Sequence, residues 1–335
     1  MNLLTHFRKS TILRFVLAGL VLLFLVPALF ADGIASRYPN DVGIENDPDV
    51  ILADGFESYT SPSQLTQKWD VVGGVSRMRI ATEPGNFFAG HKSLEMQLPV
   101  SQVEQVDLVS LKPLSPTEPV LYVRVYEKFD SGFLCRPGIA PGHNGIRIAG
   151  DFPIGGAGHR APPDGSGFFL FTLENADLKS RVGRRYRPKN RAGENQPGFA
   201  DIYAYWPYQR MDYGDHFYPN GWVIPGGRGL WILHPFQYPD FRPMPNWQPI
   251  RGIWYCYEYM VKINDLGSNN GEIAFWINGQ LKGRWTNLFM RSRQSLKIDE
   301  VALLLHANAN HSTHLNKKWY DNVVIARSYI GPISH

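Results

Sequence analysis

Tyr203 and Tyr205 are the two side chains of this sequence that best suit acid–base chemistry. They lie in the run Ile-Tyr-Ala-Tyr-Trp at residues 202 to 206, and the two-residue period of a β-strand places both rings on one side. A phenol donates a proton, and a cation beside it favours the ionised form that accepts one. The spacing therefore predicts a proton-transfer pair. Two half-buried strand residues without a chemical role are the alternative.

A second segment combines aromatic rings with cations. One side of the predicted strand at residues 120–129 carries Tyr122, Arg124, Tyr126 and Lys128. Rings cover the C–H surface of a sugar, and a guanidinium binds a carboxylate through two parallel hydrogen bonds. We therefore expect Arg124 and Tyr126 to bind a sugar. An amphipathic sheet surface without a ligand is the alternative.

Strands must position these side chains, and the sequence predicts many. The clearest is a hairpin in which Ile273, Phe275 and Ile277 alternate with other residues before the turn pair Asn278-Gly279. Other predicted strands are 93–98, 120–129, 167–173, 201–206, 229–234, 253–264, 300–305 and 320–325. No long amphipathic helix alternates with them, and 335 residues with 44% hydrophobic content can bury a large core. We expect one all-β domain, an antiparallel two-sheet jelly roll of the concanavalin or lectin type.

The N-terminal residues are predicted to serve targeting rather than folding. Arg8, Lys9 and Arg14 precede an apolar run at residues 15–30, and small residues follow. We expect residues 1–35 to be a cleaved signal peptide, or a retained N-terminal anchor, that contacts the membrane during export. Residues 36–50 are then a polar linker, and residues 51–335 form a monomeric domain that is secreted or held in the periplasm or cell envelope.

The order of motifs along residues 52 to 332 resembles the concanavalin-like jelly roll of alginate lyases and related polysaccharide lyases, closest to polysaccharide lyase family 14. A Tyr-bearing strand leads to the basic-Pro-Gly loop at Arg136, followed by the Tyr-x-Tyr strand and the Tyr-Gly-Asp loop at 213–215. Asn264, the Gly-Glu-Ile-Ala-Phe-Trp-Ile-Asn-Gly hairpin and a terminal Asp-Asn-Val complete the series.

This resemblance implies β-elimination on a uronate polysaccharide. The family's loop lysine falls on Arg136, and its paired tyrosines fall on Tyr203 and Tyr205, which would serve as base and acid. Arg124 or Arg136 would neutralise the uronate carboxylate so that charge can develop at the reacting carbon. The family's Ser-x-Arg is not present at residues 167–173, and an arginine is a poor proton acceptor. A non-catalytic, lectin-like glycan-binding module is therefore the alternative, and a glycoside hydrolase ranks last because no strand carries a paired-acid pattern.

Other polar residues add to the predicted site. His306 follows an apolar strand segment and is a third candidate for acid–base work. Seven cations lie between Lys179 and Arg191, and we expect Arg184, Arg185 and Arg187 among them to attract an anionic polysaccharide; a solvated loop is the alternative. Nucleic acid is not an expected partner, because the net charge is only +4 and no reader motif occurs.

No cofactor is required for the predicted chemistry, but the resemblance implies a structural calcium ion. Glu57 near the start of the domain and Asp321 in its last strand would hold the ion with backbone carbonyls; capping and surface pairing of these carboxylates is the alternative. Cys135 and Cys256 could form one disulfide or remain two buried thiols.

Overall fold

The structure is a computed structural model, and it describes residues 32–100, 106–134, 144–153, 162–176, 197–209, 213–225, 232–233, 244–307 and 315–335. Residues 32–335 form one compact unit built from two antiparallel sheets. Within the described ranges the helices are short 3-10 turns. A search of the same ranges finds no helix that is long and apolar enough to cross a membrane.

Sheet A has eight strands among the described residues, and its order is not that of the chain. Its main path runs β15 (Gln280–Leu288), β14 (Gly271–Ile277), β13 (Tyr255–Lys262), β6 (Val120–Phe129), β17 (Asn316–Ala326), β4 (Ser93–Leu98) and β3 (Met78–Ala81). β1 (Val50–Asp54) pairs with the C-terminal half of β17. The last strand of the chain therefore lies in the middle of sheet A.

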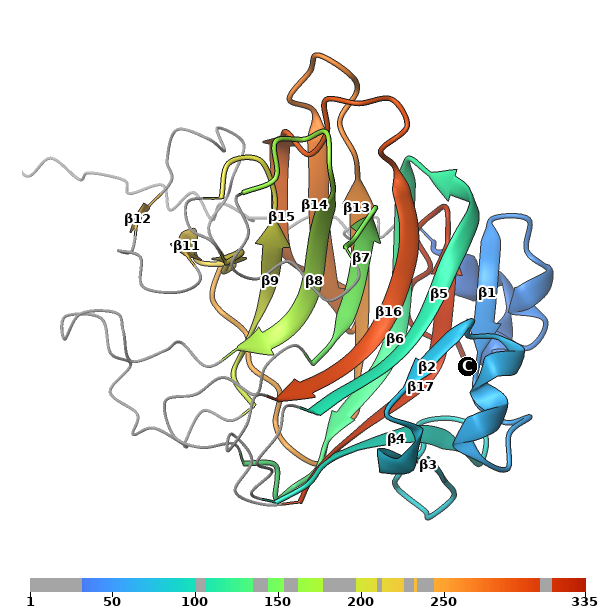
Figure 1. The fold of residues 1–335 in the computed structure, drawn as a ribbon. Coiled ribbons are helices and arrows are strands. Elements are labelled where there is room, and N and C mark those ends of the chain that lie inside the picture. Colours follow the sequence, from blue (N-terminus) through green and yellow to red (C-terminus); the bar gives the residue numbers. More distant parts are fainter. Residues whose placement is uncertain are drawn as a thin grey trace, which may run out of the picture. The chain divides into compact units, whose positions relative to one another are not determined.

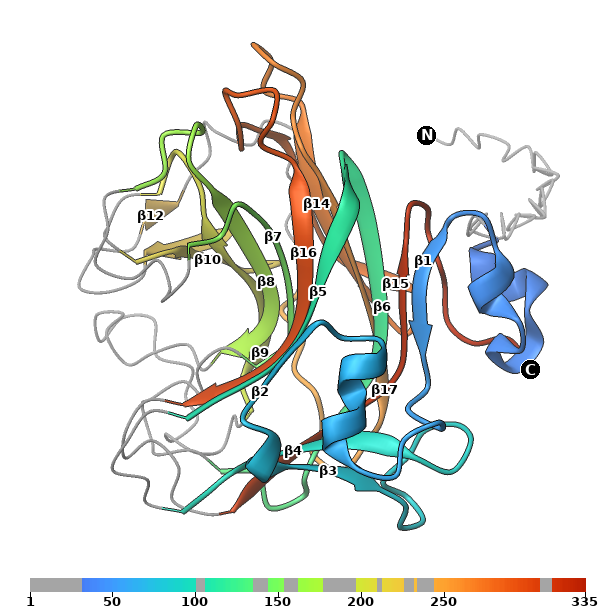
Figure 2. The same ribbon diagram turned by 45° about the vertical axis from the view of Figure 1, so that its right-hand side comes forward.

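Sheet B has nine strands among the described residues. The order is β12 (Ile232–Leu233), β11 (Trp222–Pro225), β10 (Asp215–Phe217), β9 (Phe199–Tyr205), β8 (Phe169–Ala176), β7 (Ile146–Gly150), β16 (Ile298–Ala307), β5 (Val106–Glu118) and β2 (Val71–Gly73). Figure 1 shows β9, β8, β7, β16 and β5 side by side, and Figure 2 shows β8 and β16 bending along their length. The predicted antiparallel jelly roll is confirmed.

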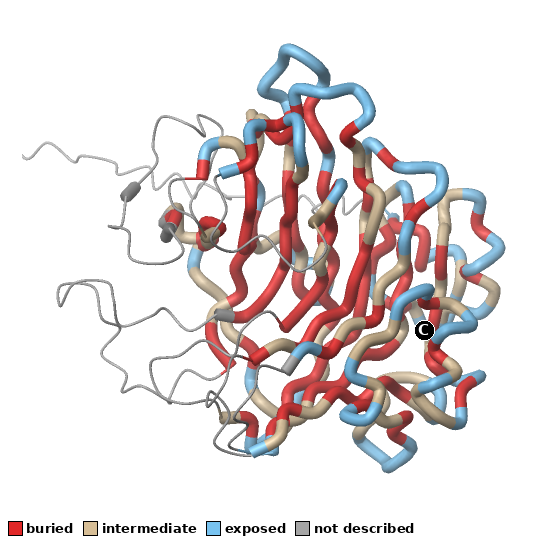
Figure 3. The backbone as a smooth tube through the Cα atoms, viewed as in Figure 1, coloured by how far each residue is buried: buried red, intermediate tan, exposed pale blue. Residues whose placement is uncertain are grey.

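The core lies between the two sheets and follows the two-residue period of the strands. Alternate residues of β14 (Ile273, Phe275 and Ile277) are buried in it, and buried residues run along the strands of both sheets while exposed ones gather in the connections (Figure 3). The turn after β14 has φ values of 50° at Asn278 and 75° at Gly279, the pair of positive angles that the Asn-Gly sequence predicts. The hairpin prediction is therefore confirmed.

One ionic pair lies inside this apolar core. Lys318 of β17 and Glu127 of β6 are buried, and Lys318 Nζ lies 2.8 Å from the Glu127 carboxylate. Lys318 also donates a hydrogen bond to the carbonyl oxygen of Asn144, just before β7. On the same strand, the Tyr320 hydroxyl donates to the carbonyl of Leu304 in β16 at 2.6 Å. Strand β17 is therefore linked by hydrogen bonds to sheet B as well as to its own neighbours.

Both ends of the compact unit pack on the outward face of sheet A. The 3-10 turns η1 (Ile34–Arg37), η2 (Pro39–Asp41) and η3 (Ile44–Asn46) lie there, with Ile34 and Ile44 buried against Val324 and Ile330. The amide of Ile34 donates to the carbonyl of Tyr329 at 3.0 Å. Residues 36–50 therefore differ from the expected polar linker, because Ile44 is buried on the sheet and Tyr38 and Val50 pack against the same cluster.

Two further 3-10 turns, η4 (Pro62–Gln67) and η5 (Val75–Arg77), flank β2. Figure 2 shows β1 and the N-terminal turns beside β17, on the side of the unit away from β8 and β10. We call the outward surface of sheet A, on which η1, η2, η3 and the C-terminal residues pack, the covered face. The outward surface of sheet B, which carries Tyr203 and Tyr205, is the tyrosine face.

Candidate active site

Strand register places one residue from each of four strands in a row across the tyrosine face. Arg147 of β7 lies opposite Thr172 of β8, which lies opposite Tyr203 of β9, which lies opposite His216 of β10. Directly opposed residues point to the same side of an antiparallel sheet with short separations. The row therefore brings together a guanidinium, a hydroxyl, a phenol and an imidazole from four segments of the chain.

The tyrosine pair has a defined geometry. The Tyr203 hydroxyl donates to the Tyr205 hydroxyl at 3.1 Å, and the amide of Gly214 donates to the Tyr203 oxygen at 3.1 Å. Each ring is 5% exposed, so the hydroxyls lie in a largely dry environment. Burial raises the pKa of Tyr203 well above its ordinary value, and Tyr205 and Glu174 raise it further. The pair is arranged to exchange a proton, but its environment resists formation of a phenolate.

A histidine and two carboxylates flank Tyr203. Nδ1 of His216 lies 2.6 Å from Oδ2 of Asp201 and 3.9 Å from Oε1 of Glu174. Asp201 and Glu174 are buried and directly opposed on β9 and β8. The centroid of the His216 ring lies 4.7 Å from that of Tyr203. Two carboxylates facing one imidazole favour its protonated form, because a nearby opposite charge stabilises the cation.

Sequence analysis did not identify His216, Asp201 or Glu174 as site residues. The strand that carries His216 has only three residues, Asp215–Phe217, which is too short for a recognisable alternating pattern. One signal was available, since Asp201 precedes Tyr203 by two residues and must share its side of the strand. The opposing positions 174 and 216 depend on register between segments, which local spacing does not fix.

The row across the tyrosine face contains one guanidinium, that of Arg147. It lies on β7 and not on β8, the strand that directly precedes the tyrosines. The outward residues of β8 are Leu170, Thr172 and Glu174, whereas Arg147 lies one strand further away on β7. Its Nε lies 2.8 Å from Oε1 of Glu300, and both side chains are about six-sevenths buried. Burial lowers the pKa of Arg147 and raises that of Glu300. The guanidinium of Arg147 is therefore already engaged by a carboxylate of the protein itself.

Arg124 does not lie at the tyrosine face, so the structure does not bring it together with Tyr203 and Tyr205. It is fully buried on the covered face, where it forms an ion pair with Asp41. It also donates to the carbonyl oxygens of Gly331 and Asn322 at 3.2 Å each. Alternation along β6 was predicted correctly, but a segment 83 residues away occupies the guanidinium.

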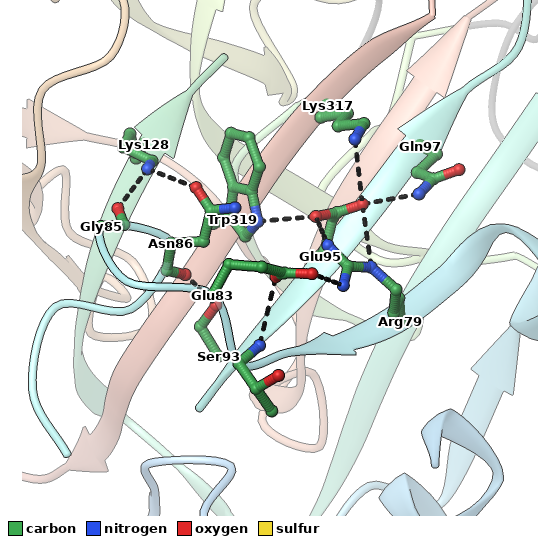
Figure 4. Close-up of polar contacts among 11 residues, drawn as sticks. Arg79, Glu83, Gly85, Asn86, Ser93, Glu95, Gln97, Lys128, Lys317 and Trp319 are labelled. Carbon is green, nitrogen blue, oxygen red and sulfur yellow. Dashed lines mark hydrogen bonds and ion pairs between the residues drawn. The ribbon is translucent and has the colours of Figure 1, made fainter. Parts of the chain in front are cut away.

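The neighbouring residues of β6 are also occupied by the protein itself. Tyr126 stacks on Phe88 with centroids 3.7 Å apart, and its hydroxyl accepts the amide of Ile333 at 2.9 Å, so both its ring and its hydroxyl contact the protein itself. Lys128 donates to the carbonyl oxygen of Gly85 and to Asn86, as Figure 4 shows. The same view shows the buried Glu95 carboxylate contacted by Arg79, Gln97, Lys317 and Trp319. Polar groups of the covered face therefore bind one another.

His306 shares the tyrosine face but lies far from the tyrosines. Its ring contacts Asp107 of β5. Strands β7 and β8 separate its strand, β16, from β9, which puts the two strands about 14 Å apart. Ala302 is the β16 residue in line with Tyr203, and His306 lies four residues beyond it, about 13 Å along the strand. The structure therefore does not bring His306 into the predicted acid–base group.

Several predicted residues lie outside the described ranges. They are Arg136, Arg184, Arg185, Arg187 and Cys135. Cys256 is described and is a free, buried thiol packed beside Tyr126, and burial raises its pKa to about 12. It therefore behaves as a small apolar side chain on the covered face.

The two carboxylates predicted to hold calcium accept backbone hydrogen bonds. Oδ2 of Asp321 accepts the amides of Phe88 and Ala89 at 2.7 and 3.2 Å. Oε1 of Glu57 accepts the amides of His91 and Lys92, both at 2.8 Å. Burial raises the pKa of Asp321 to about 8, and Glu57 adds to the shift. Because N–H donors already satisfy these oxygens, the geometry gives calcium no independent support, and calcium at this pair stays a prediction.

Comparison with known proteins places the fold. No protein-family model matches the chain, and no curated protein matches it. Among solved structures, alginate lyase Aly36B is similar with a TM-score of 0.55 and 16% identity, over 84% of this chain and 98% of that one. A marine PL-14 alginate lyase from Aplysia kurodai is similar with a TM-score of 0.52 and 13% identity, over 83% and 99%. The chain therefore has the jelly-roll fold of these polysaccharide lyases.

Proposed function

We propose that this protein binds an acidic, uronate-containing polysaccharide at the tyrosine face and cleaves it by β-elimination. The observation that carries the proposal is the pair of tyrosine hydroxyls, 3.1 Å apart on the outward face of sheet B. The fold adds support, because a variant of the similar protein Aly36B was solved in complex with an alginate tetrasaccharide; that structure has a TM-score of 0.54 and 15% identity to this chain.

The tyrosine pair can supply both proton transfers of the reaction. One phenolate takes the proton from C5 of the uronate, a C4–C5 double bond forms, the C4–O4 bond breaks, and the other phenol protonates the departing O4. Tyr203 donates its hydrogen bond to Tyr205, so Tyr205 is the better placed acceptor and Tyr203 the better placed donor. A proton passed from Tyr205 to Tyr203 across the 3.1 Å contact then restores the starting state.

Neutralising the uronate carboxylate requires a cation, because negative charge develops at the adjacent carbon. Among the described residues of the tyrosine face, Arg147 is in the same row as Tyr203. The face also carries Glu174, Asp201 and Glu300, which would repel an anionic chain. We therefore propose that the basic run at residues 179–191 assists Arg147 in attracting and holding the polymer.

The test is turnover by tyrosine variants. The purified protein is mixed with alginate or glucuronan, and the ultraviolet absorbance of the conjugated product is followed. Tyr203→Phe and Tyr205→Phe keep the rings but remove the proton-carrying groups, so turnover should fall by about 10²- to 10⁴-fold while glycan binding survives. His306→Gln is the matched control on the same face and should retain activity. A wild-type protein that forms no unsaturated product from either polymer would refute cleavage of these substrates.

A non-catalytic glycan-binding module is the second candidate. Two observations favour it: the pKa of Tyr203 is raised well above its ordinary value, and Arg147 is engaged by Glu300. A phenol that stays protonated can still stack on a sugar and donate a hydrogen bond. In this case the wild type binds the polymer without turnover, and both Tyr→Phe variants keep most of the affinity.

Export is also proposed, and it rests on the sequence. The charged residues, apolar run and small residues at positions 8–35 support a signal that is cleaved or retained as an anchor. The burial of Ile34 and the hydrogen bond from its amide favour cleavage before that residue. Sequencing the N-terminus of exported protein tests this, and a mature chain that begins at Ser36 would contradict the proposed cleavage position.

A further inference from the structure

We propose that His216 is a positioning residue whose positive charge, held by Asp201 and Glu174, stabilises the ionised form of the tyrosine pair. This inference rests on the proposed function, because it concerns the same two tyrosines. It adds a role for Glu174 of β8, Asp201 of β9 and His216 of β10. These three side chains take no part in the proton transfers described above.

The charge of His216 depends on the two carboxylates beside it. Its Nδ1 lies 2.6 Å from Asp201 and 3.9 Å from Glu174, and the polar atoms of all three side chains lie within 4.8 Å of one another. Both carboxylates are buried, so the low local dielectric strengthens their attraction for the imidazolium. Tyr203 and Tyr218 face the ring from β9 and from the segment after β10. Asp201 and Glu174 therefore favour the protonated, positively charged form of His216.

The second step is the effect of that cation on Tyr203. The two rings are in contact, with centroids 4.7 Å apart and planes inclined by 47°. A phenolate needs a nearby positive charge, whereas Glu174 by itself opposes ionisation of Tyr203. An imidazolium in contact with the tyrosine ring offsets the carboxylates. Removal of His216 would take this positive charge away from the tyrosine pair.

The third step is the consequence for the reaction. β-Elimination needs one phenolate in the pair at the start and another when the acid has given up its proton. A charge that stabilises either phenolate therefore acts on kcat rather than on the contacts that hold the polymer. The rate should rise with pH as the pair loses its first proton, and His216 sets the pH at which this happens.

The experiment compares His216→Gln with the wild type by two readouts. The first is the pH dependence of kcat, whose rising limb should move upward by about 1 to 2 pH units with little change in KM. The second needs no turnover: the Cζ resonances of ¹³C-labelled tyrosine are titrated, with Tyr203→Phe and Tyr205→Phe to assign them. The ionisation of the pair should move upward by a similar amount. Identical titration of the pair in the wild type and in His216→Gln would overturn the inference.

Two further variants keep the test decisive. Asp201→Asn leaves the imidazole in place but removes a carboxylate that favours its protonated form. His216 should then lose its positive charge at a lower pH, so kcat should fall at a lower pH than in the wild type. It also replaces His216→Gln if that variant does not fold. His306→Gln removes a second histidine of the same face that also contacts an aspartate, Asp107, far from the tyrosines. It should leave both readouts unchanged, and an equal shift in this control would also overturn the inference.

The two readouts separate this inference from the proposed function. A wild-type protein without turnover, whose tyrosine pair still titrates higher in His216→Gln, refutes cleavage and supports the role of His216. A protein with turnover whose pH profile is the same in both forms supports cleavage and refutes the role of His216.

Discussion

The covered face and the tyrosine face carry similar side chains but differ in what those side chains bind. On the covered face, Arg124 pairs with Asp41 and Tyr126 with the amide of Ile333, so contacts come from segments distant in the sequence. On the tyrosine face, Tyr203 and Tyr205 bond to each other, and the ring of Tyr203 contacts His216 of the adjacent strand β10. A row of aromatic and cationic residues along a strand therefore does not by itself indicate a ligand site.

The largest effect on stability is expected for Arg124. Arg124→Ala leaves Asp41 and two carbonyl oxygens without their donor, which should lower the free energy of unfolding by about 3 to 5 kcal/mol. Urea denaturation measures the loss. Arg147→Ala on the tyrosine face is the matched comparison and should instead weaken binding of an acidic glycan. Glycan binding reduced by Arg124→Ala in folded protein would break the distinction between the two faces.

A smaller loss is expected when the cover itself is weakened. Ile34→Ala removes a buried side chain that packs on Val324 and Ile330, which should cost about 2 to 3 kcal/mol. The exposed Val42→Ala, in the same segment, is the control and should change stability by less than about 0.5 kcal/mol. Equal stability of the two variants would show that packing of Ile34 on the covered face does not stabilise the fold.

The pH dependence of stability tests the buried carboxylate of Asp321. Its pKa is raised to about 8 in the folded state, so its contribution to stability is complete below about pH 4 and is lost as pH rises through about 8. In the wild type, the free energy of unfolding should therefore decrease as pH rises. In Asp321→Asn, this decrease should be smaller by about 1 to 2 kcal/mol. Urea curves at about pH 5, 7 and 9 measure it.

The same measurement tests the predicted calcium ion. A cation bound by Glu57 and Asp321 prefers the ionised carboxylate, so added calcium should raise stability more at high pH than at low pH. A melting temperature that responds neither to calcium nor to a chelator would exclude the ion and leave Asp321 with its amide donors alone.

The smallest effect is expected for the basic run. Replacing Arg184, Arg185 and Arg187 with Gln should weaken binding of an acidic glycan a few-fold at low salt and reduce its salt dependence, because screened long-range attraction is lost. Binding of a neutral glycan is the control. If the triple variant binds the acidic glycan as the wild type does at low salt, the tyrosine face attracts its ligand without these residues.

The fold could be predicted from the sequence because alternation and turn residues are local. β4 and β6 begin and end where predicted, and the Asn278-Gly279 turn follows from the angles those residues tolerate. β5 was missed because Pro113 and Pro116 argue against a strand. The two prolines are tolerated because Pro116 lies in the irregular stretch between Pro113 and Glu118 where the register with β16 shifts, and because β2 on the other side pairs only with Val109, Ser110 and Leu111.

The candidate site could be predicted only in part. The shared side of Tyr203 and Tyr205 follows from their spacing, but their neighbours depend on which strands pair. Arg147 lies on a five-residue strand next to β8, and no local pattern marked that strand. The contact of Arg124 with Asp41 could not be predicted, because the segment around Asp41 has the composition of a linker. Pairing between distant segments is decided by the energy of the whole fold rather than by a short window.

The position of β17, the last strand of the chain, constrains the order in which the strands of sheet A can pair. This strand contacts β6, β4 and β1 and also donates hydrogen bonds into sheet B through Lys318 and Tyr320. Until β17 joins them, β6 and β4 lack their shared neighbour and β1 lacks its partner. Such long-range pairing is slow and exposes strand edges to association with other chains. Sheet A should therefore form only once β17, the last strand of the chain, joins β6, β4 and β1.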